Sequence, residues 1–141
     1  MSAPGRLAVD ASVVVKWYLP EEGSEQAAHL LREVPDRVAP DMLAAEVSNI
    51  LLRKVRTGEL MACEALDIAA ALSGECPVEL RPGRPLLGLA LDIALRQGCT
   101  VYDALYIAVA LTEDCPLVTA DADLVRRCDE GALGGVVRLL A

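Results

Sequence analysis

The chain has 141 residues, of which 54% are hydrophobic and 24% are charged, and its formal net charge at pH 7 is −8. This composition excludes an intrinsically disordered chain, and the length predicts a single domain over residues 1–141. The excess of acids argues against nucleic-acid binding, because phosphate contacts need Lys or Arg, unless the acids gather around divalent cations.

The amino-terminal residues and the cysteines indicate the cellular compartment. Residues 1–5 lack the basic and apolar blocks of a signal peptide, and no apolar run reaches the roughly 18 to 20 residues of a membrane helix. The five cysteines are widely spaced, with one histidine, His29, to join them in a zinc site. We therefore expect a reduced, cytoplasmic protein with buried thiols and no membrane contact.

The first half of the chain is predicted to begin with a buried strand. In chain order we expect a strand, two helices, a strand and two more helices, over residues 6–9, 11–19, 21–33, 37–39, 42–57 and 61–72. Pro20 ends the first helix. Asp41 is expected to cap the helix that begins at residue 42, and Gly58 ends that helix.

The second half continues the alternation of strands and helices. We expect a strand, two helices, a strand, a short helix and a last strand, over residues 78–80, 86–97, 101–112, 117–119, 124–128 and 136–140. This order predicts an α/β fold in which helices flank a short parallel sheet. Ligands of such sheets bind beyond the carboxyl ends of the strands.

Four acids interrupt the apolar pattern of these elements. Asp10 and Asp121 each follow an apolar strand. Glu46 lies within the apolar stripe of its predicted helix, and Asp103 lies in the first turn of a helix that is apolar nearly all round. A carboxylate that faces a core needs a partner, or it takes up a proton.

Each acid also has a plain structural explanation. Asp10 and Asp121 can cap the helices that follow them, Asp103 can interact with a helix dipole, and Glu46 can lie at the edge of its stripe. Four clustered acids would nevertheless repel one another unless a cation lay between them. Oxygen ligands without histidine or thiolate favour Mg²⁺ or Mn²⁺, so the pattern predicts metal-assisted hydrolysis of a phosphodiester bond.

Four segments of the chain resemble a known family: VDASVVVKWYLPEE, PDMLAAEVSNIL, TVYDALYIAVAL and LVTADADL. In this order they are similar to the four acidic motifs of PIN domains, and most closely to those of VapC ribonuclease toxins from toxin–antitoxin pairs. The resemblance covers nearly the whole chain. It implies a PIN-like three-layer sandwich with a short parallel sheet of about four to five strands, and a nuclease site that uses Mg²⁺ or Mn²⁺.

The matching motifs imply that Asp10, Glu46, Asp103 and Asp121 form an acidic quartet that binds the metal and carries out catalysis. Asp10 and Asp103 are expected to be direct metal ligands. Glu46 is expected to hold the attacking water, and Asp121 to complete the site or bind a second ion.

Further polar residues lie beside these motifs. Ser12 and Thr119 fit the small hydroxyl positions and are expected to support the acids by hydrogen bonds. Asp123 is a reserve metal ligand, with a helix cap as its alternative role. Asp92 interrupts an apolar run but matches no motif.

The leading hypothesis is an endoribonuclease toxin that cleaves structured RNA, is silenced by a cognate antitoxin protein and acts as a homodimer. The basic residues Arg53, Lys54 and Arg56 are candidates for contacts with the RNA backbone, or they form a solvated helix end.

Two alternatives keep the same fold, namely a housekeeping PIN nuclease in RNA processing and a PIN-like module that binds a partner without catalysis. A metal-dependent phosphatase of another α/β fold fits poorly. Such enzymes usually carry a second aspartate two residues after the first, and this chain has Ser12 there.

Overall fold

The computed structural model of the chain describes residues 5–141 and contains one five-stranded parallel sheet. In chain order the strands are β1 (Arg6–Val9), β2 (Asp36–Pro40), β3 (Glu79–Arg81), β4 (Leu117–Thr119) and β5 (Val137–Leu139). Their order across the sheet is β3-β2-β1-β4-β5. The predicted α/β class, the parallel sheet and all five predicted strands are confirmed.

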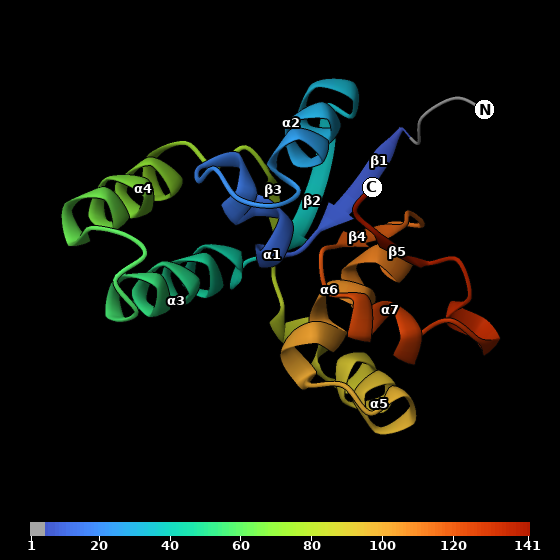
Figure 1. The fold of residues 1–141 in the computed structure, drawn as a ribbon. Coiled ribbons are helices and arrows are strands. Elements are labelled where there is room, and N and C mark those ends of the chain that lie inside the picture. The colour runs from blue at the N-terminus through green and yellow to red at the C-terminus, as the bar shows by residue number, and fades with distance from the viewer. Residues whose placement is uncertain (1–4) are drawn as a thin grey trace.

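Within the described part of the chain, seven α-helices flank this sheet (Figure 1). They are α1 (Ala11–Val14), α2 (Ser24–Glu33), α3 (Leu43–Arg56), α4 (Ala62–Gly74), α5 (Leu87–Gln97), α6 (Val101–Thr112) and α7 (Ala122–Arg127). Figure 1 shows α3 and α4 extending away from the sheet on the side opposite to β5. The predicted helix 101–112 is found with the same bounds.

Two predicted features of the first helices are wrong. The helix predicted over residues 11–19 ends at Val14 and continues only as a 3-10 turn over Val15–Trp17, because a run of β-branched valines limits helix propagation. Asp41 does not cap α3, whose first residue follows Met42. The Asp41 carboxylate instead accepts a hydrogen bond from the backbone N–H of Gly83, at 3.2 Å.

The connections between the strands place a crevice between β1 and β4. The chain moves from β1 to β2 and β3 in one direction across the sheet, and then returns past β1 to β4 and β5. Right-handed crossovers therefore place the helices after β1 and β2 on one face and the helices after β3 and β4 on the other. The connections that leave β1 and β4 diverge at their carboxyl ends, where ligands bind in such folds.

The core is aliphatic and is dominated by α6. All residues of α6 from Ala104 to Ala110 are buried, and its alanines allow this helix to approach β1 and β2 closely. On α3, the stripe of Leu43, Val47 and Leu51 is fully buried, as the apolar spacing predicts. None of the helices within residues 5–141 is long and apolar enough to cross a membrane.

The prediction of buried thiols is only partly right. Cys128 is buried in the core, whereas Cys63 is exposed on α4.

Candidate active site

A pocket of about 620 Å³ lies beside the carboxyl ends of β1 and β4, between α3 and α6. The four predicted acids, Asp10, Glu46, Asp103 and Asp121, all line this pocket. Glu46 comes from α3 and Asp103 from α6, while Asp10 and Asp121 follow the two central strands. The fold thus brings together residues that are up to 111 positions apart in the sequence.

Asp10 is held at the end of β1 by hydrogen bonds to both carboxylate oxygens. The Ser12 hydroxyl donates to Oδ1 and the Thr119 hydroxyl donates to Oδ2, each at 2.5 Å. The backbone N–H of Val13 also donates to Oδ1, so that Asp10 caps α1 as well as facing the pocket. Ser12 and Thr119 therefore contact the acid that they were predicted to support.

Burial and mutual repulsion disfavour the charged forms of these acids. Asp10 is 8% exposed, and this burial raises its pKa to about 6 against the opposing effect of its hydrogen bonds. Burial, followed by the charges of Asp103 and Asp10, also raises the pKa of Glu46 to about 6. Burial raises the pKa of Asp103 too, with a further contribution from Asp121.

The other two acids lie at the beginnings of helices. The Thr100 hydroxyl caps α6 by accepting from the backbone N–H of Asp103, which fixes Asp103 in the first turn. Asp121 caps α7, because its Oδ1 accepts from the backbone N–H groups of Asp123 and Leu124 at 3.0 and 3.2 Å. Asp121 and Asp10 therefore each cap a helix and also line the pocket.

The remaining predicted acids lie outside this pocket. Asp123 does not cap α7, because Asp121 occupies that position, and its carboxylate forms ion pairs with Arg126 and Arg127. It lines a smaller neighbouring pocket that also contacts Asp103 and Asp121. Asp92 forms an exposed ion pair with Arg96 on its own helix and does not line the acidic pocket.

The pocket also contains residues that the sequence pattern did not single out, chiefly Asn49 and Tyr106. Asn49 lies three residues after Glu46, and Tyr106 lies three residues after Asp103. Residues three apart share a helix face, so this spacing from the predicted acids could have identified both residues from the sequence.

The donor set of the pocket fits a hard divalent cation. All four acids offer oxygen atoms, and none of the residues that line the pocket within residues 5–141 is a histidine or a cysteine. As the side chains stand, no three Asp, Glu, His or Cys residues within residues 5–141 surround a common point closely enough to hold an ion directly. An ion that keeps part of its water shell, as Mg²⁺ usually does, needs fewer direct carboxylate ligands.

The contact between Thr119 and Asp10 leads to a prediction for stability. Replacing Thr119 with Val leaves Asp10 Oδ2 and the backbone N–H of Asp121 without partners. We expect the free energy of unfolding at pH 7.5 to fall by about 1–3 kcal/mol, as measured by urea denaturation. Thr112→Val is the control, since the Thr112 hydroxyl contacts only a backbone carbonyl of its own helix. Equal losses in the two variants would contradict the prediction.

Known proteins share this fold and its family. The family model of the PIN domain matches residues 7–130. The chain therefore belongs to the PIN-domain family, in which the sequence motifs had placed it.

Within that family, the relatives with similar sequences are VapC proteins. The chain is 34% identical to Ribonuclease VapC3 of Pyrobaculum aerophilum over 123 residues, which cover 86% of this chain and 94% of the relative. It is 35% identical to Ribonuclease VapC1 of Mycobacterium tuberculosis over 120 residues, covering 82% and 86% of the two chains. The recognition of a VapC-like PIN domain is confirmed.

The fold has similar solved structures. The crystal structure of VapC20 from Mycobacterium tuberculosis, described as a toxin that cleaves the sarcin-ricin loop, superposes with a TM-score of 0.68 at 18% identity. The match covers 85% of this chain and 93% of VapC20. This likeness confirms the PIN fold.

Proposed function

We propose that the protein is a Mg²⁺- or Mn²⁺-dependent endoribonuclease that acts as the toxin of a toxin–antitoxin pair. The observation that carries the proposal is the convergence of Asp10, Glu46, Asp103 and Asp121 on one pocket at the carboxyl ends of β1 and β4. The names of the VapC ribonucleases that the chain resembles support RNA as the substrate.

The four acids have separate roles in this proposal. Asp10 and Asp103 would hold the cation, with Asp10 oriented by Ser12 and Thr119, and Asp121 would complete the site. When bound, Mg²⁺ or Mn²⁺ neutralises charge on the phosphate and makes water a better nucleophile. The Glu46 carboxylate takes the proton of the attacking water as the phosphodiester bond breaks, and its pKa of about 6 keeps it deprotonated at neutral pH.

Exposed apolar side chains support the two proposed protein partners, a cognate antitoxin and a second copy of the chain. Leu87, Leu91 and Leu95 form an exposed row along α5, and Met61 and Leu66 are exposed at α4. Exposed apolar side chains that share one helix face, like the row on α5, are typical of surfaces that associate with another protein.

Cleavage of RNA by the purified protein tests the proposed function. We expect wild-type protein to cut total RNA with Mg²⁺ or Mn²⁺, and to cut none of it with EDTA. Asp103→Asn removes one charge from the pocket and should abolish cutting, whereas Asp92→Asn should not, because Asp92 lies outside the pocket. Cutting that survives Asp103→Asn or EDTA would refute the proposed site.

Arg53 is the basic residue best placed to contact the RNA backbone. It lines the acidic pocket from α3, whereas Lys54 forms an ion pair with Glu21 at 2.8 Å. We expect Arg53→Ala to raise KM for RNA by about three- to tenfold, with little change in kcat. The dependence of KM on salt concentration should also become weaker in this variant. Arg56→Ala is the control outside the pocket, and an equal rise in KM there would contradict a specific role for Arg53.

A further inference from the structure

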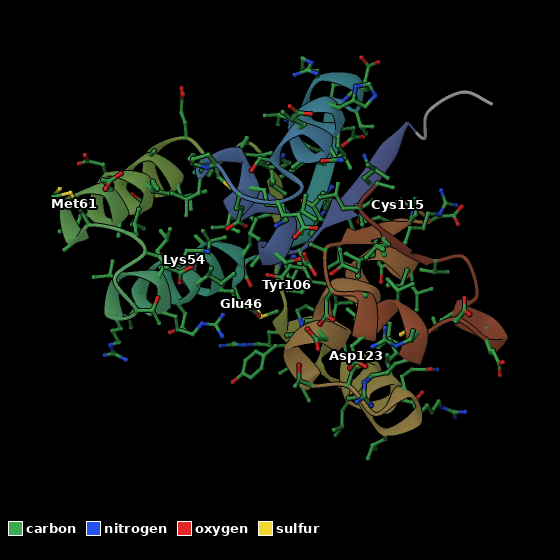
Figure 2. The ribbon with its side chains drawn as sticks, in the orientation of Figure 1. Glu46, Lys54, Met61, Tyr106, Cys115 and Asp123 are labelled. Atoms are coloured by element: carbon green, nitrogen blue, oxygen red, sulfur yellow. The ribbon has the colours of Figure 1, made fainter. Side chains whose placement is uncertain are left out.

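Two buried side-chain atoms lack a hydrogen-bond partner within residues 5–141, namely Glu46 Oε1 and the hydroxyl of Tyr106. Both residues line the acidic pocket, Glu46 from α3 and Tyr106 from α6, and Figure 2 labels them close together between these helices. Buried polar groups in folded proteins are almost always partnered. Finding both exceptions in one pocket indicates that the two atoms are related.

The two groups are chemically complementary. An ionised carboxylate can only accept hydrogen bonds, and a phenol can donate one. Burial raises the pKa of Tyr106, and the charges of Glu46 and Asp10 raise it further, so the phenol keeps its hydrogen. The backbone N–H of Ala11 lies close enough to the phenol oxygen to oppose this rise in pKa. Ala11 N–H is itself a donor, however, so the phenol hydrogen still lacks an acceptor.

Asp10, whose charge also acts on Tyr106, competes less well than Glu46 for the Tyr106 hydrogen. Both carboxylate oxygens of Asp10 already accept from the hydroxyls of Ser12 and Thr119. Both unpartnered atoms are covered by protein. A small rotation of the Glu46 side chain, whose Oε1 is held by no hydrogen bond, is the simplest way to satisfy both atoms.

We propose that Tyr106 is a positioning residue whose hydroxyl donates a hydrogen bond to Glu46 Oε1. This bond fixes the carboxylate on α3 relative to α6 and leaves Oε2 as the oxygen that faces the pocket. The catalytic consequence rests on the proposed ribonuclease function, in which Glu46 takes a proton from water. The hydrogen bond itself does not depend on that function.

A double-mutant cycle on the protein without metal or RNA tests the hydrogen bond. The variants are Tyr106→Phe, Glu46→Ala and the two combined, and thermal unfolding is measured at pH 7.5, where Glu46 is ionised. We expect Tyr106→Phe alone to lower Tm by about 3–5 °C, and to have no such effect in the Glu46→Ala background. A Tm that stays the same or rises in both backgrounds would show that the hydroxyl has no partner in Glu46.

Steady-state RNA cleavage tests the positioning role. Tyr106→Phe should lower kcat about tenfold with KM for RNA changed less than about twofold, because the hydroxyl does not contact RNA. Tyr102→Phe is the matched control, since Tyr102 lines the same pocket from the same helix but is 64% exposed. Coupling in the cycle with an unchanged kcat would overturn the positioning role. If the cycle shows coupling between Tyr106 and Glu46 but the wild-type protein cuts no RNA, the ribonuclease proposal is refuted and the hydrogen bond is established.

Discussion

Asp10→Asn is expected to abolish RNA cleavage and, at the same time, to make the metal-free protein more stable at pH 7.5. Loss of this carboxylate should lower kcat by about a thousandfold or more, because the amide is a poor ligand for a hard cation and carries no charge. The fold should survive, since the amide oxygen of asparagine can accept from Val13 as a helix cap, as the carboxylate does.

The gain in stability follows from the cost of keeping Asp10 charged in a buried place. Its pKa is raised by burial from 3.8 to about 6, so ionised Asp10 costs the folded protein about 3 kcal/mol at pH 7.5. Asparagine removes this cost but donates an amide hydrogen toward Thr119, where the carboxylate accepted one. We therefore expect a net gain of about 1–2 kcal/mol, or a rise in Tm of about 3–6 °C.

The pH dependence of this gain distinguishes it from a general effect of the substitution. At pH 5 folded Asp10 takes up a proton while unfolded Asp10 stays ionised, so the cost of burying Asp10 falls to about half its value at pH 7.5. The unfavourable contact of the asparagine amide then balances it, and the difference in Tm between wild type and Asp10→Asn should nearly vanish. Asp36→Asn is the control, because Asp36 pairs with Arg6 at the opposite end of the sheet. If Asp10→Asn cut RNA at the wild-type rate, that result would contradict the assigned role of Asp10.

Mn²⁺ is expected to stabilise the protein strongly at pH 7.5 and weakly at pH 5. A cation at about one hundred times its Kd adds about 2.7 kcal/mol to the free energy of unfolding. It binds ionised carboxylates, and protons compete with it once the pH falls below the pKa values of about 6 of Asp10 and Glu46.

The metal-free protein should show the opposite trend with pH. Because the folded-state pKa values of these two acids lie above their unfolded values, their contribution to stability increases as pH falls through 6 toward 4 and is lost as pH rises again. Differential scanning calorimetry with Mn²⁺ and with EDTA at pH 5 and 7.5 measures both trends. An equal effect of Mn²⁺ at the two pH values would show that it does not bind at these acids.

Local sequence patterns predicted the secondary structure well, and the four acids that they singled out line one pocket, for identifiable reasons. The helix Val101–Thr112 combines a long apolar run with a capping hydroxyl at Thr100, so local sequence specifies both that a helix forms and where it begins. Glu46 stands out because it breaks an apolar stripe, and its position on the helix follows directly from the helical period.

The features that were missed depend on contacts between distant parts of the chain. Asp41 resembles a helix cap locally, yet its partner is the backbone of Gly83, 42 residues away. Tyr106 lies in a helix that is apolar nearly all round, so only its spacing of three residues from Asp103 indicates that it shares the face that meets the pocket. That face is set by the packing of α6 against β1 and β2.

The central position of β1 in the sheet has a consequence for synthesis of the protein. Asp10 and Glu46 lie in the first third of the chain, whereas β4, which pairs with β1 and carries Asp121 at its end, lies in the last fifth. A nascent chain folds from its amino terminus as it leaves the ribosome, so it exposes two of the four acids long before the others. The acidic pocket can assemble only after β4 has been made and has paired with β1, which delays any nuclease activity until that point of synthesis.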